Sequence, residues 1–64
     1  MNDVIPGATY HDGAVDDNFH CNGVTTDPEG VKKVRIEYFG SGATLSIPME
    51  TFKAEPMFEI VEQP

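Results

Sequence analysis

Residues 31–47, VKKVRIEYFGSGATLSI, are the only long segment of this chain with a clean period, and they predict a β-hairpin. Apolar residues alternate with charged ones before the turn and with Thr and Ser after it, so one face of each strand is apolar. The tripeptide GSG at 40–42 supplies two residues that adopt positive φ without a Cβ penalty. The inward set is Val34, Ile36, Tyr38, Leu45 and Ile47. A lone hairpin is marginal in water, so the rest of the chain is expected to cover this face.

The covering material is limited, because the chain has 64 residues. We expect one small β domain over 1–64, with loose ends at 1–5 and 62–64. Cys21 is the only cysteine, so an internal disulfide is excluded and a reducing, cytoplasmic location is expected. No apolar run approaches the length of a membrane helix. The first ten residues also lack the basic and apolar regions of a signal peptide.

Acidity is the most unusual bulk property. Eleven acids against four bases give a net charge of −7. The asymmetry along the chain is sharper, because residues 1–30 carry six acids and no Lys or Arg. Such a field repels DNA, RNA and anionic membranes and attracts basic protein surfaces. It also serves the general purpose of keeping a small domain soluble.

Before the hairpin, residues 8–10 and 19–24 are predicted to be short strands. Residues 11–18 (HDGAVDDN) are polar, acidic and glycine-bearing, and they predict an exposed loop. Gly23 inside the second strand predicts a bulge. Residues 25–30 (TTDPEG) predict a tight turn. The residues expected to face inward here are Tyr10, Phe19 and Cys21.

After the hairpin, Pro48 ends the strand because it has no N–H for a sheet ladder. Residues 49–52 (METF) are too few for an independent helix, and a single 3₁₀ turn is predicted that places Phe52 over the sheet. Residues 57–61 (MFEIV) predict a last strand with inward Phe58 and Ile60. The whole predicts an all-β fold, either a small SH3-like barrel or a curled five-stranded antiparallel sheet with one short 3₁₀ turn.

The order of these elements resembles the small SH3-like barrels found as single-domain proteins of unknown function in phages and prophages. In those barrels a Pro-Gly-x-x-Tyr start and a Pro-x-x-x-Phe turn bracket five strands. The residues that carry the resemblance are Pro6, Gly7, Tyr10, Phe19, Val34, Ile36, Tyr38, Pro48, Phe52, Phe58 and Val61. The chain departs from the pattern in its longer, acidic first loop. Loops at that position often meet partners in SH3-like barrels, so the resemblance implies a binding role there.

Metal and catalytic chemistry find little support in the sequence. His11, His20 and Cys21 are the only soft ligands, and their H-x₈-H-C spacing lacks the paired short spacings of zinc sites. The acidic segment from Asp12 fails the calcium-loop pattern, because Gly23 stands where a closing Glu is needed. A catalytic pair also needs an orienting group and a cleft, so an enzyme is not expected and no cofactor is predicted. A metal-stabilised module stays open as an alternative.

A basic stripe is the one feature that favours direct nucleic-acid binding. Lys32, Lys33 and Arg35, with Phe39 beyond them, are predicted on the outer face of the central strand, where they could follow a phosphate backbone. The net charge opposes this, and the alternative is a solvated face that protects the strand from aggregation. Direct nucleic-acid binding is therefore not expected.

The sequence is best explained as a non-enzymatic, acidic protein-binding module. An acidic face can occupy a basic groove meant for phosphates, as DNA-mimic inhibitors do. We therefore expect a phage or prophage accessory protein that inhibits a host nucleic-acid-handling protein. The predicted contact residues are Asp12, Asp16, Asp17, Asp27 and Glu29. The alternative is a structural or self-assembling subunit, possible as a homodimer, that associates through the apolar side chains of Phe39, Met49 and Met57.

Overall fold

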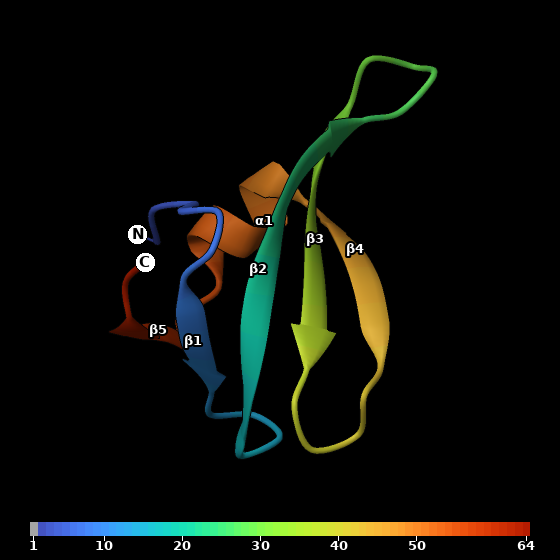
Figure 1. Ribbon diagram of the computed structural model, residues 1–64. Coiled ribbons are helices and arrows are strands. Elements are labelled where there is room, and N and C mark those ends of the chain that lie inside the picture. The colour runs from blue at the N-terminus through green and yellow to red at the C-terminus, as the bar shows by residue number, and fades with distance from the viewer. Residues whose placement is uncertain (1) are drawn as a thin grey trace.

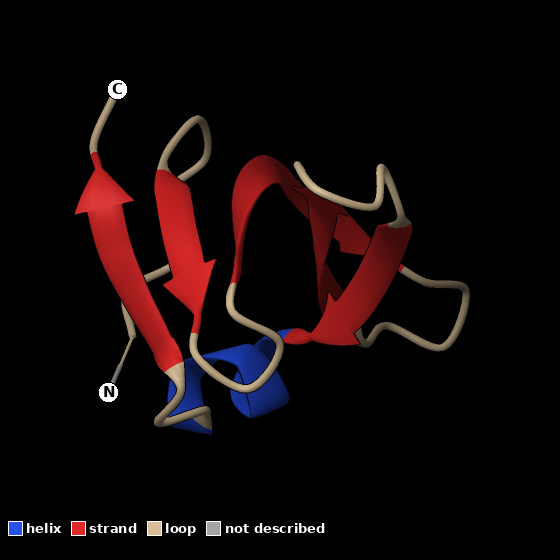
Figure 2. Cartoon of the chain, turned by 90° about the horizontal axis from the view of Figure 1, so that it is seen from below, coloured by secondary structure: helices blue, strands red, loops and turns tan. Residues whose placement is uncertain are grey.

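In the computed structural model, which describes residues 2–64, five antiparallel strands form one sheet with the spatial order β4-β3-β2-β1-β5 (Figure 1). The strands are β1 (Thr9–Asp12), β2 (Asp17–Thr26), β3 (Lys32–Tyr38), β4 (Thr44–Pro48) and β5 (Phe58–Glu62). One helix, α1 (Met49–Ala54), connects β4 to β5. Figure 2 shows that the sheet curls and that the helix lies to one side of it. The predicted all-β class with a curled five-stranded sheet is confirmed.

The hairpin of β3 and β4 supplies part of the core, as predicted. Val34 and Ile36 are fully buried, and Tyr38 and Ile47 pack against the core from its edge. The expectation for Leu45 was wrong, since 48% of this residue is exposed. It lies on the core side opposite Ile36, but β4 is the last strand of the sheet, and no strand formed by residues 2–64 pairs with its open edge.

Residues 49–54 form a six-residue α-helix and not the predicted 3₁₀ turn. A helix forms here despite its shortness, because packing of one apolar face stabilises a helix that propensity alone would not. Phe52 is that apolar face. It is fully buried, as predicted, and its ring meets Tyr10 edge-on at 5.1 Å and Phe58 at 5.2 Å. Glu50 in the first turn and Lys53 in the last also suit the helix dipole.

The central strand β2 is longer than the sequence pattern indicated. It starts at Asp17, ends at Thr26 and pairs with both β1 and β3. Its register shifts beside Gly23, whose φ is +135°, so the predicted bulge is confirmed. The loop predicted over 11–18 was wrong in extent: β1 continues to Asp12, and only four residues separate it from β2.

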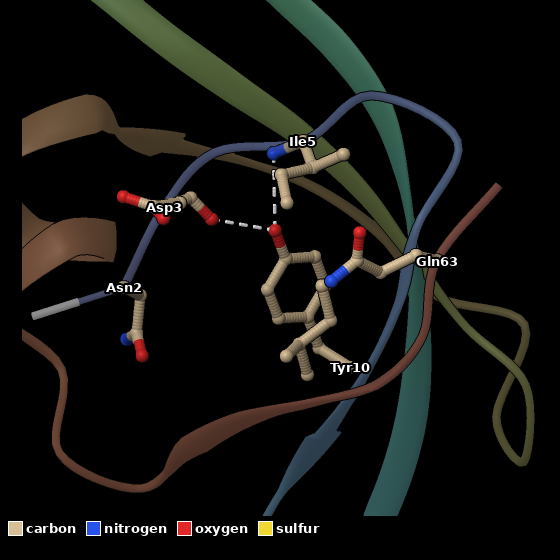
Figure 3. A pocket seen from close by; sticks show the side chains of 6 residues that line it. Asn2, Asp3, Ile5, Tyr10 and Gln63 are labelled. Carbon is tan, nitrogen blue, oxygen red and sulfur yellow. Dashed lines mark hydrogen bonds between the residues drawn. The ribbon is translucent and has the colours of Figure 1, made fainter.

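The N-terminal segment is attached to the helix and the core. The Asn2 side-chain amide donates to the carbonyls of Phe52 and Glu55 at 3.0 and 2.7 Å. The Tyr10 hydroxyl donates to the Asp3 carbonyl at 2.6 Å and accepts from the Ile5 N–H at 3.0 Å (Figure 3). Over residues 2–64, no helix has the length and apolar character needed to cross a membrane.

Candidate functional site

Asp12, predicted to be a partner contact, is buried with only 5% exposure. It continues the alternation of β1, in which Tyr10 two residues earlier also points into the core. One carboxylate oxygen accepts from the Tyr38 hydroxyl at 2.7 Å, and the other accepts from the Ala14 N–H at 3.0 Å. Both carboxylate oxygens accept hydrogen bonds from within the protein and the side chain is buried, so Asp12 is not available to a partner.

Asp17 connects the β1–β2 loop to the β3–β4 turn. Its two carboxylate oxygens each lie 3.1 Å from the Gly40 nitrogen, whose N–H donates to them. A Cβ added at Gly40 would lie 2.8 Å from one of these oxygens. Gly40 is therefore needed for this close approach. Its expected positive φ was wrong, and within the GSG turn only Gly42 has one, at +73°.

Asp16 is the freely exposed acid of this loop. Its side chain is 95% exposed, and its Oδ1 lies 3.4 Å from Nε2 of His11, a contact that becomes an ion pair when the imidazole is protonated. The backbone at Asp16 has a φ of +52°, which Asp and Asn tolerate better than other side chains. Of the acids predicted in this loop, Asp16 is thus the one whose carboxylate is fully presented to solvent.

Asp27 and Glu29 lie in the β2–β3 turn. The Asp27 carboxylate accepts from the N–H groups of Glu29 and Val31, both at 2.9 Å, and lies 3.6 Å from the Lys33 ammonium. The hydrogen bond from Val31 is the main cause that lowers the pKa of Asp27, with Glu29 and Lys33 adding to it. Asp27 thus organises its own turn, while Glu29 is exposed.

The predicted acidic residues do not form one face. β2 is ten residues long. Asp16 and Asp17 lie at its start, whereas Asp27 and Glu29 lie beyond its end. Figure 1 shows the β1–β2 loop and the β2–β3 turn at opposite ends of the molecule, whose longest dimension is 32 Å. A strand that rises about 3.3 Å per residue accounts for this separation.

A shallow groove lies where the β1–β2 loop meets the β3–β4 hairpin, and we call it the loop groove. Its volume is about 450 Å³. The lining residues are Val15, Asp17, Tyr38, Ser41, Ala43 and Leu45. Most of the lining is apolar, Asp17 is the one acidic residue among the lining residues, and Val15 is 61% exposed. The groove can therefore accept an apolar side chain next to a positive charge.

Sequence reasoning missed Val15 and Leu45. Val15 lies in a polar segment, and a single apolar residue there produces no hydrophobic periodicity from which its position could be predicted. Leu45 carried the signal of an inward residue, and its exposure follows from its place on the end strand.

The three predicted apolar contacts do not form one patch. Phe39 is 57% exposed and follows Tyr38 at the start of the turn that borders the loop groove. Met57 is also exposed, and its carbonyl accepts from the Gly13 N–H at 2.9 Å, at the same end of the molecule. Met49, the first residue of α1, is half-buried against the core.

The histidines and the cysteine are not brought together. Cys21 is fully buried in the core, while His11 and His20 have the opposite parity and lie on the outer face of the sheet. Burial raises the pKa of the Cys21 thiol, which keeps it protonated and poorly nucleophilic. Within the described part of the chain, no three His, Cys, Asp or Glu side chains are arranged to hold a metal ion.

The predicted basic stripe is divided between two faces. Lys32 shares the parity of Val34, whereas Lys33 and Arg35 lie on the outer face. Lys33 is also engaged with Asp27. The expectation of three positive charges on one outer face was therefore wrong.

Comparison of the chain with protein-family models, with curated proteins and with solved structures finds no match.

Proposed function

We propose that this protein is a non-enzymatic module that binds a basic segment of another protein through the loop groove. The observation that carries the proposal is the combination of exposed apolar side chains and carboxylates at one end of the molecule. Val15 and Leu45 offer apolar area, Asp17 places negative charge in the groove, and Asp16 adds an exposed carboxylate on the adjoining β1–β2 loop. A Lys or Arg next to an apolar residue fits both features.

The net charge of −7 supports the choice of a basic partner, because the field of the whole protein attracts positive segments and accelerates their encounter. Proteins that handle nucleic acids expose such segments. We accordingly propose that the partner is a host nucleic-acid-handling protein, that binding inhibits it, and that the chain acts in the cytoplasm as a phage or prophage accessory protein. The division of the acids between two ends favours a local contact at the loop groove over mimicry of a long run of phosphates.

The test uses variants that change the loop groove without disturbing the fold. Asp16→Asn removes the exposed charge and tolerates the positive φ, and Val15→Ser removes the exposed apolar side chain. Glu29→Gln removes an exposed acid at the opposite end and is the matched control. Tagged wild type and variants are used to recover partners from host lysate at low and high salt, and each recovered partner is then measured with the purified proteins.

We expect Asp16→Asn to weaken binding about two- to fivefold at low salt, the size of one exposed charge pair. Val15→Ser should weaken it about tenfold through lost apolar burial. Glu29→Gln should bind as wild type does. Equal binding by all three variants would contradict the proposal. A mass that grows with concentration, with no partner recovered, would instead favour the self-assembling subunit.

A further inference from the structure

The strand β4 ends the sheet on one side, and its outer edge is unpaired within the described residues. The Tyr38 N–H donates to the Ala43 carbonyl at 2.9 Å, so Tyr38 and Ala43 are a hydrogen-bonded pair of the ladder between β3 and β4. Because bonded positions alternate in an antiparallel pair, Leu45 and Ile47 direct their main-chain groups toward β3. Thr44 and Ser46 therefore present two N–H and two C=O groups to the open edge.

Pro48 has the same parity as Thr44 and Ser46. Its missing N–H would also have faced the open edge, so the proline breaks no ladder bond with β3. It marks the end of the segment that another strand could pair with. The available edge is thus short and begins beside the loop groove, where Ala43 and Leu45 are lining residues.

The two end strands of the sheet, β4 and β5, differ in how their open edges are protected from pairing with a further strand. Proteins guard exposed edges with charged side chains. β5 carries Glu59 and Glu62, and its Phe58 N–H points to the Glu55 carbonyl at 3.4 Å. β4, with the sequence TLSIP, carries no charge. The edge of β4 is therefore the one suited to accept a further strand.

We propose that the basic segment bound by this protein adds to β4 as an extended strand. An added strand lies about 4.8 Å away, and its alternate side chains would cover the exposed core-side surface of Leu45. A Lys or Arg at the end nearest Ala43 would lie close to Asp17, which lines the loop groove together with Ala43. The inference rests on the proposed function and specifies the backbone conformation and side-chain pattern of the partner.

A second copy of this chain is a poorer occupant. Each copy carries a net charge of −7, so two copies repel each other. A basic segment gains from the same field that opposes self-association. The partner strand is therefore assigned to a different protein whose strand carries an apolar side chain and, two positions along on the same face, a Lys or Arg.

The experiment selects random heptapeptides displayed on phage against the immobilised protein and measures synthetic versions of the enriched ones. Ser46→Pro removes an edge N–H and leaves the β3–β4 ladder intact, because that N–H faces outward. Ser46→Ala keeps the N–H and is the matched control. Amide hydrogen exchange of the wild type, with and without peptide, gives a reading that does not depend on any variant.

We expect enriched peptides to carry an apolar residue two positions away from a Lys or Arg, so that both side chains lie on the face that meets Leu45 and Asp17. Ser46→Pro should weaken their binding at least about tenfold, because the main-chain bonds of the edge are lost, and Ser46→Ala should change it less than about twofold. Bound peptide should slow exchange at Thr44 and Ser46 while leaving the already bonded Leu45 amide unchanged.

The outcomes separate this inference from the function on which it rests. If Val15→Ser weakens peptide binding and Ser46→Pro does not, the loop groove stands and strand addition is wrong. If neither weakens it, or no peptide is enriched, both proposals fail. Unchanged exchange at Thr44 and Ser46 overturns strand addition even where Ser46→Pro does not fold. A wild-type dimer that Ser46→Pro dissociates would assign the edge to a second copy and also overturn it.

Discussion

The Tyr38 hydroxyl donates a 2.7 Å hydrogen bond to the buried carboxylate of Asp12, which joins β3 to the end of β1 across the intervening strand. The two residues are 26 positions apart in the sequence. The bond satisfies a carboxylate oxygen that would otherwise be buried without a partner, and it holds the floor of the loop groove in place, because Tyr38 also lines that groove.

Tyr38→Phe should lower the free energy of unfolding by about 1–3 kcal/mol, because a buried acceptor is left unsatisfied. Urea denaturation followed by circular dichroism measures the change. Tyr10→Phe is the comparison variant: its hydroxyl bonds to main-chain groups of Asp3 and Ile5 that line a surface pocket, so water can replace the hydroxyl and the effect should be smaller. A Tyr38→Phe protein as stable as wild type would show that the bond to Asp12 contributes nothing.

Alkaline pH should destabilise the protein. Burial is the main cause that raises the pKa of Tyr38 and of Tyr10, and the Asp12 carboxylate raises that of Tyr38 further. Above about pH 10 the unfolded chain loses these protons while the folded chain keeps them, so stability is full below that pH and falls as pH rises through the folded-state values. Urea midpoints between pH 8 and about 11.5 measure it. Tyr38→Phe should flatten the decline, and an unchanged slope would contradict this assignment.

Phe52→Ala should cost about 3–5 kcal/mol and leave most molecules of so small a domain unfolded. The ring is the only fully buried side chain of α1 and contacts Tyr10, Phe19 and Phe58, so its loss detaches the helix from the sheet. Thermal unfolding gives the measurement. Phe39→Ala removes a ring that is largely exposed, and it should change the midpoint little. Equal effects of the two substitutions would refute the assigned core.

Gly40→Ala should destabilise the protein by about 0.5–1.5 kcal/mol, the net contribution of a hydrogen bond, because its Cβ would displace the Asp17 carboxylate from the Gly40 N–H. A double-mutant cycle with Asp17→Ala tests the cause. If the glycine is needed only to admit that carboxylate, the combined loss should be clearly smaller than the sum of the single losses. Additive losses would mean that Gly40 is required for some other reason.

The sequence predicted the fold better than the site, and particular residues show why. Alternation in 31–47 identified the hairpin, and the Pro48 to Phe52 spacing correctly placed Phe52 over the sheet, because both signals are local. Asp12 was assigned to a loop, although continuing the alternation from Tyr10 would have turned it inward. The exposure of Leu45 depends on which strand ends the sheet, and the separation of Asp17 from Asp27 depends on the length of β2. Strand order and pairing length are long-range properties that no local pattern contains.

The bond between Asp17 and Gly40 has a kinetic consequence. Both walls of the loop groove are held together before any partner arrives, so binding requires little further ordering of this protein. Association should then proceed at the speed of charge-steered diffusion, and complexes of differing strength should differ mainly in how long they last.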